Sequence, residues 1–193
     1  MGLGTLPCMV SPIGPAAALL SRYQAQGVDE SADVRAVLAL LDVQEDPWSQ
    51  ALPLHLTSSA LVVHPPTGRI LLRWHRRIHA WLQIGGHGDP GERNPIEVAL
   101  REGREETGLP DLTPWPAADL VHVVVVPVPA NSVSPAHRHA DLRFVLATGT
   151  PELARAERPD APVRWLTAVQ ASAATSESNL RETISRVRRR FAG

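Results

Sequence analysis

The stretch from Gly85 to Leu109 constrains this chain more than any other part of its sequence. It reads GGHGDPGERNPIEVALREGREETGL, a glycine-dense loop followed by a helical pattern. Asn94 is of a residue type favoured at an N-cap, Glu97 stands at capping-box spacing after it, and Gly108 is a typical helix stop. The pattern therefore predicts a helix from Pro95 to Thr107.

Three carboxylates of this predicted helix lie on one of its sides. At 100° per residue, Glu102, Glu105 and Glu106 share one face. Like charges three and four residues apart disfavour a helix by about 0.2–0.5 kcal/mol per pair, and negative charge near its C-terminus is also unfavourable. Acids that break local rules together are typical of a functional site, and a hard divalent cation is their natural compensation. The opposite, packing face consists of Ile96, Ala99, Leu100, Gly103 and Thr107.

Two further features of the stretch favour a metal site. Arg101 stands four residues from both Glu97 and Glu105, the spacing of a helical charge ladder, which predicts that it orients the Glu105 side chain. The glycines of the loop permit a close approach of the backbone, so that a main-chain carbonyl oxygen could bind the same cation. The alternative is a solvated acidic helix after a flexible turn. The joint presence of loop, cap, acidic face and glycine stop argues against that alternative.

Residues 86–109 resemble the Nudix box, commonly written G-x5-E-x7-R-E-U-x-E-E-x-G-U with U an apolar residue. Two departures stand out: residues 93–100 place eight positions instead of seven between Glu92 and Arg101, and Gly103 takes the first apolar position. The additional residue falls before or at the helix start, so that it lengthens the turn without rotating the acidic face. The matching residues, in order, are Gly86, Glu92, Arg101, Glu102, Glu105, Glu106, Gly108 and Leu109.

The resemblance implies an α/β fold, the Nudix-type α/β/α sandwich with a mixed sheet, over residues 57–193. Residues 1–56 are then an N-terminal helical extension and connector, for which a homodimer contact is an alternative role. The implied reaction is a metal-dependent hydrolysis, in which water attacks a phosphorus of a nucleoside diphosphate linked to another moiety. The implied partner is a small nucleotide or a nucleotide-derived molecule.

The resemblance also implies roles for individual residues. Glu102, Glu105, Glu106 and the carbonyl of Gly86 would bind Mg²⁺, or Mn²⁺ as the alternative ion. Glu92 and Gly108 would support the structure of the site, and Arg101 would orient its acids. The residues expected to be catalytic are Glu102, Glu105 and Arg101. The general base stays open between Glu102, Glu105 and an acid outside the box. Weaker candidates beyond the box are Asp141 and Glu157 for a further acid, and Arg76 and Arg77 for contacts with substrate phosphates.

Two alternatives from other functional classes stay open. A nucleotide-sensing domain could keep the fold without catalysis, although such a domain need not retain the acids. An enzyme resembling isopentenyl diphosphate isomerase would need a catalytic cysteine in the domain, and the only cysteine, Cys8, is badly placed near the N-terminus.

Composition limits the remaining functional classes. The 19 basic and 20 acidic residues nearly cancel, which argues against stable nucleic-acid binding. All the basic residues are arginine, so no mechanism can use a catalytic lysine. No apolar run approaches the roughly 18 residues of a membrane span, and the N-terminus lacks the basic region of a signal peptide. A single cysteine fits the reducing cytoplasm, which is the expected location.

Periodicity predicts the other elements. The uninterrupted β-branched run in 121–128 predicts a central strand, and the final helix would expose Arg186 to solvent. His137 and His139 resemble half of a zinc site, but no second ligand pair of matching spacing follows, so we expect them at the solvent or the substrate edge. The predicted helices are 15–26, 30–42 and 177–191, and the predicted strands are 57–64, 69–75, 80–84, 121–128, 139–146 and 163–166.

Overall fold

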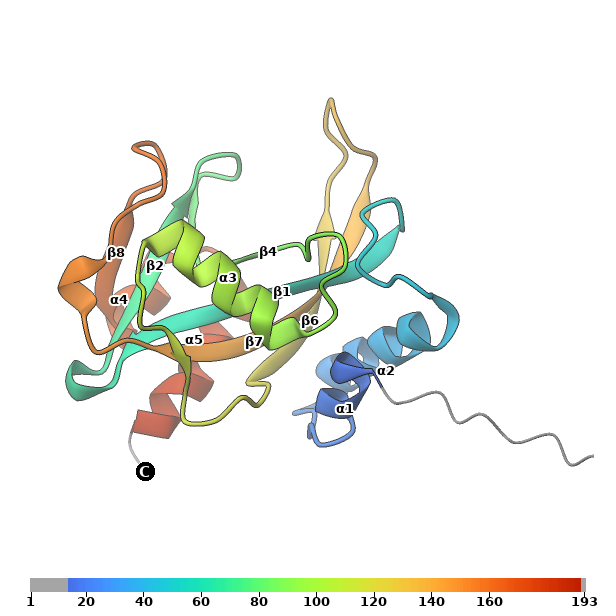
Figure 1. Ribbon diagram of the computed structural model, residues 1–193, viewed down its shortest axis with the longest axis horizontal. Coiled ribbons are helices and arrows are strands. Elements are labelled where there is room, and N and C mark those ends of the chain that lie inside the picture. The colour runs from blue at the N-terminus through green and yellow to red at the C-terminus, as the bar shows by residue number, and fades with distance from the viewer. Residues whose placement is uncertain (1–13, 192–193) are drawn as a thin grey trace, which may run out of the picture.

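The computed structural model describes residues 14–191, and Cys8 lies outside that range. Helix α3 (Pro95–Thr107) crosses one face of a mixed eight-stranded sheet, while α4 (Ala168–Ala174) and α5 (Ser178–Phe191) lie behind the other face (Figure 1). The three layers form an α/β/α sandwich, as predicted. No helix within 14–191 combines the length and the apolar character that a bilayer crossing requires.

The two longest strands form the centre of the sheet and run parallel to each other. Strands β1 and β7 pair in register from Leu54 opposite Arg138 to Val63 opposite Ala147. The path of the sheet is β3-β2-β1-β7-β5, with β4 added on β1, β6 on β7 and β8 on β2. The strands are β1 Leu54–His64, β2 Arg69–His75, β3 Ala80–Leu82, β4 Ile84–Gly86, β5 Thr113–Pro114, β6 His122–Val128, β7 His137–Ala147 and β8 Val163–Thr167.

Some element boundaries differ from the prediction. The predicted helix at 15–26 ends early, as α1 (Pro15–Leu20), and the predicted strand at 80–84 divides into β3 and β4. Helix α4 was not predicted. Its start carries a capping box in which Thr167 and Gln170 bond reciprocally, a local signal that precedes a weak apolar pattern.

The prediction that 121–128 is a central strand is wrong. Within the described chain β6 pairs with β7 alone and is therefore an edge strand. Its outer backbone is covered by helix α2 (Val28–Val43): the Val123 N–H donates to Glu30 at 3.1 Å, and the Val125 N–H donates to Asp33 at 3.0 Å. Carboxylates of α2 thus accept the hydrogen bonds that a neighbouring strand would otherwise accept. Because this edge of the sheet is covered, β6 can be as apolar as a central strand.

The box helix α3 has the predicted bounds, but its start is not capped as predicted. Gly108 ends the helix in the left-handed region with φ 66°. Asn94 occupies the N-cap position, yet its side chain makes no capping hydrogen bond, so the prediction of a capping box is wrong. The first turn is instead closed by the backbone, with the N–H groups of Glu97 and Val98 donating to the Asn94 carbonyl.

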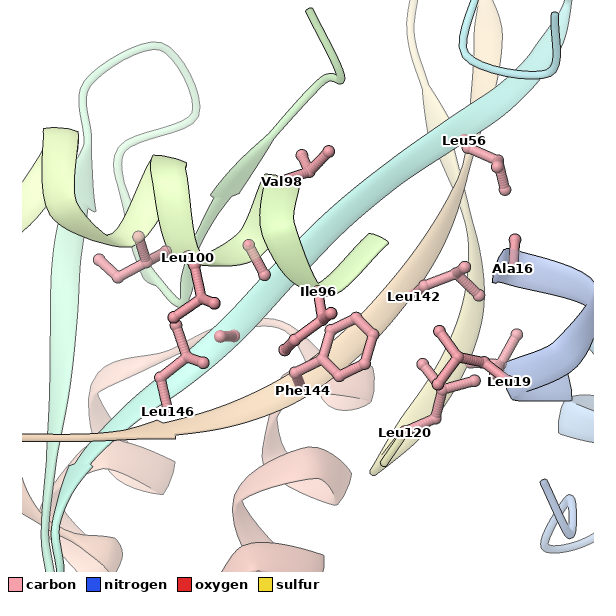
Figure 2. Close-up of a cluster of buried hydrophobic side chains, with 14 of the residues drawn as sticks. Ala16, Leu19, Leu56, Ile96, Val98, Leu100, Leu120, Leu142, Phe144 and Leu146 are labelled. Atoms are coloured by element: carbon pink, nitrogen blue, oxygen red, sulfur yellow. The ribbon is translucent and has the colours of Figure 1, made fainter. Parts of the chain in front are cut away.

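Apolar side chains of α3 pack on the central strands. Ile96 and Leu100 face Phe144 and Leu146 of β7 (Figure 2). Gly103 admits a close neighbour here, because a Cβ at this position would lie 2.7 Å from Cδ1 of Leu112. The packing face predicted for the helix is therefore the one that is buried, and the helix orientation is fixed by the core.

The N-terminal helices share this core instead of standing apart from it. Ala16 and Leu19 of α1 belong to the same buried cluster as Ile96 and Phe144. Their contact with Leu120 and Leu142 lies at the far end of the cluster (Figure 2). The division of the chain at residue 57 nevertheless stays a prediction.

The prediction that Arg186 is solvated is wrong. Its residue is only 6% exposed, and its guanidinium donates to both carboxylate oxygens of Glu30, at 2.8 and 3.0 Å. The same guanidinium donates to the carbonyl of Val121 at 3.1 Å. An arginine run at the end of a helix appears solvated in sequence, but one member of this run faces a buried acid from α2.

Candidate active site

Arg101 organises the acidic side of α3. Its Nε donates to the Glu92 carboxylate at 3.1 and 3.2 Å, and its Nη1 donates to Glu102 at 3.0 Å and to Glu105 at 2.9 Å. Its Nη2 reaches the carbonyl of His87 in the loop at 2.8 Å. One guanidinium therefore connects three carboxylates with the loop. The predicted contact with Glu105 is present, the predicted contact with Glu97 is absent within residues 14–191, and the orienting role of Arg101 stays a prediction.

Glu102 lies directly against the loop. Its side chain is 16% exposed, and a Cβ placed on Gly86 would come within 2.7 Å of its Oε1. Only glycine can bring the loop backbone this close to the carboxylate. Burial raises the pKa of Glu102, with the nearby negative charges of Glu105 and Asp89 adding to the rise.

Glu106 is the most buried acid of the group. Its Oε2 accepts from the Gly85 N–H at 3.1 Å, and its Oε1 pairs with Arg73 at 2.7 Å. Burial raises its pKa to about 7, against the opposing effect of the Arg73 charge. The sequence patterns did not predict Arg73, which lies in β2, and only the pairing of distant elements brings it to the box.

The charges around the box do not balance. Four box acids are gathered within reach of two guanidinium groups, those of Arg101 and Arg73. Within residues 14–191 no donor contacts Oε2 of Glu102 or Oε1 of Glu105, so each has an oxygen free to bind. An all-oxygen set of clustered carboxylates fits a hard divalent cation such as Mg²⁺. The four acids are Glu92, Glu102, Glu105 and Glu106.

A cleft of about 640 Å³ opens beside the box. Gly86 and Glu106 lie on its wall together with Arg77. Apolar side chains such as Ile78 and Leu82 form another part of the lining. Its volume and its mixed lining are those of a small-molecule site.

The weaker candidates from sequence are dispersed by the fold. Asp141 lies on the cleft wall, but its carboxylate is already engaged, with Arg143 donating at 2.8 Å and Ser59 at 2.9 Å. Glu157 stands 3.5 Å from Arg73 at the edge of the box. Arg76 pairs with Asp160 at 2.7 Å and, unlike Arg77, does not line the cleft.

Comparison with known proteins decides the family. A model of the NUDIX domain matches residues 53–187. The chain belongs to the Nudix family. This result confirms the resemblance, the α/β fold class and the prediction of a Nudix hydrolase.

Relatives of this Nudix chain differ in how much of it they match. The mouse and rat bis(5'-nucleosyl)-tetraphosphatases (asymmetrical) are 55% and 52% identical to it over 40 residues, which are 21% of this chain. That stretch is 26% of each relative, so the match spans about a quarter of their length.

Solved structures match much more of the chain at lower identity. A binary complex of the C. elegans Ap4A hydrolase has a TM-score of 0.58 and 17% identity, covering 72% of this chain and 98% of that one. A NUDIX family hydrolase from Clostridium perfringens has a TM-score of 0.53 and 23% identity, covering 68% and 96%. These similarities show the fold.

One group of side chains near the box was not predicted as a group. His55, His87, His137 and His139 lie together, with neighbouring ring centroids 4.9–5.3 Å apart. Burial, followed by the neighbouring histidines, lowers the pKa of His87 and of His139 to about 4. No second ligand pair follows His137 and His139 in the sequence, and His139 lines the cleft, but the fold brings His55 and His87 to them from two preceding segments.

Proposed function

We propose that this Nudix hydrolase is a Mg²⁺-dependent pyrophosphohydrolase that cleaves a nucleoside diphosphate linked to another moiety, by attack of water on a phosphorus atom. The observation that carries the proposal is the surplus of carboxylates over guanidinium groups around α3. Within the described chain this surplus leaves oxygens of Glu102 and Glu105 without a protein donor. Glu102 lies against Gly86, which lines a cleft of ligand size together with Glu106.

Each residue of the box has a distinct role in this proposal. Glu102, Glu105, Glu106 and the carbonyl of Gly86 hold Mg²⁺, with Mn²⁺ as a substitute. When bound, the ion would neutralise charge on the phosphoryl oxygens and lower the pKa of a water molecule. Arg101 fixes the Glu102 and Glu105 side chains, and it is a positioning residue because all its partners are protein groups.

Glu102 is our candidate for the general base. Its Oε2 has no donor within the described chain, and burial raises its pKa toward the range in which a carboxylate accepts a proton efficiently. Glu106 is less suited, because both of its oxygens already accept hydrogen bonds or pair with Arg73.

The lining of the cleft and the relatives support the proposed substrate class. Arg77 offers a charge to phosphates, and the apolar lining offers surface to a nucleoside. The 40-residue match to bis(5'-nucleosyl)-tetraphosphatases supports placing dinucleoside polyphosphates first among the substrates to test. All four box acids are present, which favours a hydrolase over a sensing domain. The only cysteine precedes the domain, which disfavours an isomerase.

A substrate panel tests the proposal. We would assay dinucleoside polyphosphates, ADP-ribose, NADH, nucleotide sugars, coenzyme A and nucleoside triphosphates, each with Mg²⁺, with Mn²⁺ and with EDTA. At least one should be hydrolysed only with metal, and Glu105→Gln should reduce that rate about a hundredfold or more, since a ligand carboxylate stabilises the transition state by several kcal/mol through the ion.

Glu97→Gln is the matched control, because Glu97 is an exposed acid on the same helix. It should leave the rate unchanged. Equal rates for Glu105→Gln and the wild type on every active substrate would remove the metal assignment. Cytoplasmic location and a homodimer stay predictions.

A further inference from the structure

Four of the eight histidines in the chain lie together, and two of them, His87 and His139, line the cleft. The ring nitrogens of His55, His137 and His139 all lie within 4.8 Å of one another. Nε2 of His87 is 3.2 Å from Nε2 of His55, and Nε2 of His137 is 3.2 Å from Nε2 of His139. One ring nitrogen each of His55, His137 and His139 therefore points toward a common space, and His87 lies beside this group at hydrogen-bond distance from His55.

The central strands explain three of the four positions. Strands β1 and β7 run parallel in a register that places His55 opposite His139. His137 stands two residues before His139, so that both project from the same face of β7. These positions belong to the sheet and not to a free loop, so the three imidazoles are held in place without a ligand.

The box loop supplies the fourth imidazole. Gly86 lies against Glu102, and Gly88 lies so close to the buried Trp48 that a Cβ would be 2.8 Å from its ring. Arg101 also holds the carbonyl of His87 at 2.8 Å. The loop is therefore fixed on both sides of His87, whose ring is directed toward His55.

The hydrogen bonds of the cluster favour metal binding through Nε2. Nδ1 of His55 lies 3.0 Å from the Leu52 carbonyl, and Nδ1 of His137 lies 2.8 Å from the Pro135 carbonyl. A carbonyl can only accept, so Nδ1 of both rings carries the proton and Nε2 keeps its lone pair. Metal-binding histidines are usually oriented by such a contact at the other nitrogen.

Two of the nitrogen–nitrogen distances in the cluster suit a known coordination geometry. Tetrahedral Zn²⁺ with Zn–N bonds of about 2.0–2.1 Å requires ligand nitrogens about 3.3–3.4 Å apart. The two measured Nε2 to Nε2 distances are 3.2 Å. Imidazole is a ligand that zinc prefers, whereas the box carboxylates suit magnesium.

We propose that His55, His137 and His139 bind one Zn²⁺ ion, at a second metal site next to the carboxylate site of the box, with His87 beside it at hydrogen-bond distance from His55. His55 is 1% exposed and forms its floor, and the partly exposed His137 and His139 give the ion access. His87 belongs to the box loop and contacts His55, so an ion that fixes the His55 imidazole would also hold this loop against the start of β1. Zinc binding would then stabilise the loop that carries the Gly86 carbonyl.

Equilibrium dialysis of the untagged full-length chain tests the proposal. The protein is dialysed against Zn²⁺ in excess Mg²⁺, which occupies the box carboxylates. The wild type should retain about one Zn²⁺ per chain, and a His137→Gln/His139→Gln variant should retain close to none. With Co²⁺ as the probe, the wild type should show the strong visible absorption of a tetrahedral nitrogen site, and that absorption should disappear in the variant.

Two controls make the result decisive. His64→Gln changes a histidine at the far end of β1 and should keep the full zinc content. Glu105→Gln/Glu106→Gln removes box carboxylates and should also keep it. Single His137→Gln, at the partly exposed start of β7, reports on the site if the double variant does not fold.

Two results would overturn the proposal. The first is equal zinc retention by the wild type and the folded histidine variants. The second is no retention by the wild type, which would mean that the cluster holds only paired imidazole hydrogen bonds.

Discussion

Two arginine-centred networks in this protein have similar components and opposite charge balance. Around Arg101, a single guanidinium meets the carboxylates of Glu92, Glu102 and Glu105. Around Arg186, the guanidinium makes two hydrogen bonds to the buried carboxylate of Glu30. It also contacts the exposed Glu182, which is shared with a second arginine, Arg189, at 3.7 Å. The first network has negative charge to spare and the second has almost none.

The side chains of the balanced network are also less exposed than those of the unbalanced network. The side chains of Arg186 and Glu30 are 5% and 4% exposed, so that pair must satisfy itself within the protein. Arg101 is 23% exposed and Glu105 is 52% exposed, so their surplus charge can be met by a ligand from solution. An unbalanced, accessible network indicates binding, whereas a balanced, buried network indicates architecture.

The largest effect should come from breaking the balanced network. Arg186→Met leaves the Glu30 carboxylate buried without its partner, and we expect it to lower the free energy of unfolding by about 3–5 kcal/mol. Urea denaturation measures this change. The rate per folded molecule should stay unchanged, because Arg186 lies outside the cleft lining. A loss of stability below about 1 kcal/mol would remove the contrast between the two networks.

The next effect is a pH dependence of stability that arises beside the balanced network. Burial, followed by the positive charges of Arg143 and Arg186, lowers the pKa of His122 from 6.5 to about 4. Between these values the unfolded chain binds the proton and the folded chain does not, so stability decreases as the pH falls from about 6.5 to about 4. At about 1.4 kcal/mol per pKa unit, the loss from this group is at most about 3.5 kcal/mol.

Urea denaturation at pH 7 and pH 5 would measure this loss in the wild type and in His122→Gln. The variant should lose less stability on acidification than the wild type. The pKa values of His87 and His139 are also lowered, so these two residues reduce stability on acidification in both proteins. An identical loss in both proteins would therefore assign the whole effect to such groups and none of it to His122.

A smaller effect, on rate instead of stability, should come from the unbalanced network. Arg101→Lys keeps the charge but cannot hold Glu92, Glu102, Glu105 and the His87 carbonyl together. We expect the rate to fall about 10–100-fold, as for other residues that orient metal ligands, with little change in thermal midpoint. A large loss of stability with unchanged activity would assign Arg101 to architecture.

The smallest effect is expected at the exposed edge of the balanced network. Glu182 contacts Arg186 at 2.8 Å in an i,i+4 pair, but its side chain is 44% exposed. Glu182→Gln should therefore lower stability by only about 0.3–0.5 kcal/mol. A loss comparable with that of Arg186→Met would show that exposure does not separate the two partners of this arginine.

Sequence patterns predicted the parts of the site that lie close together along the chain. The acids of α3 and the glycine loop fall within 24 residues, 86–109, so helical periodicity and spacing were sufficient. The pairing of Arg73 with Glu106 and the meeting of His55 with His139 depend on strand pairing, which spacing does not encode. Arg186 is buried because it pairs with Glu30, which is 156 residues away in the sequence, and local patterns do not indicate such a contact.

The fold was predictable to a similar extent and for the same reason. Most helices and strands follow from local periodicity, but the neighbours of a strand do not. A run of β-branched residues reports burial, and β6 is buried at an edge by α2 instead of between two strands. Burial and central position are therefore separate properties, and only the first can be read from such a run.

The acidic cover on β6 has a practical consequence for anyone who shortens this protein. A chain limited to residues 53–187, the part matched by the family model, would lack both Glu30 and Asp33. The amides of Val123 and Val125 would then face water as an open pairing edge, and a second molecule could add a strand there. The trimmed protein would keep its active-site residues, but it would self-associate at this edge and would also lose stability, because Arg186 would be left without Glu30.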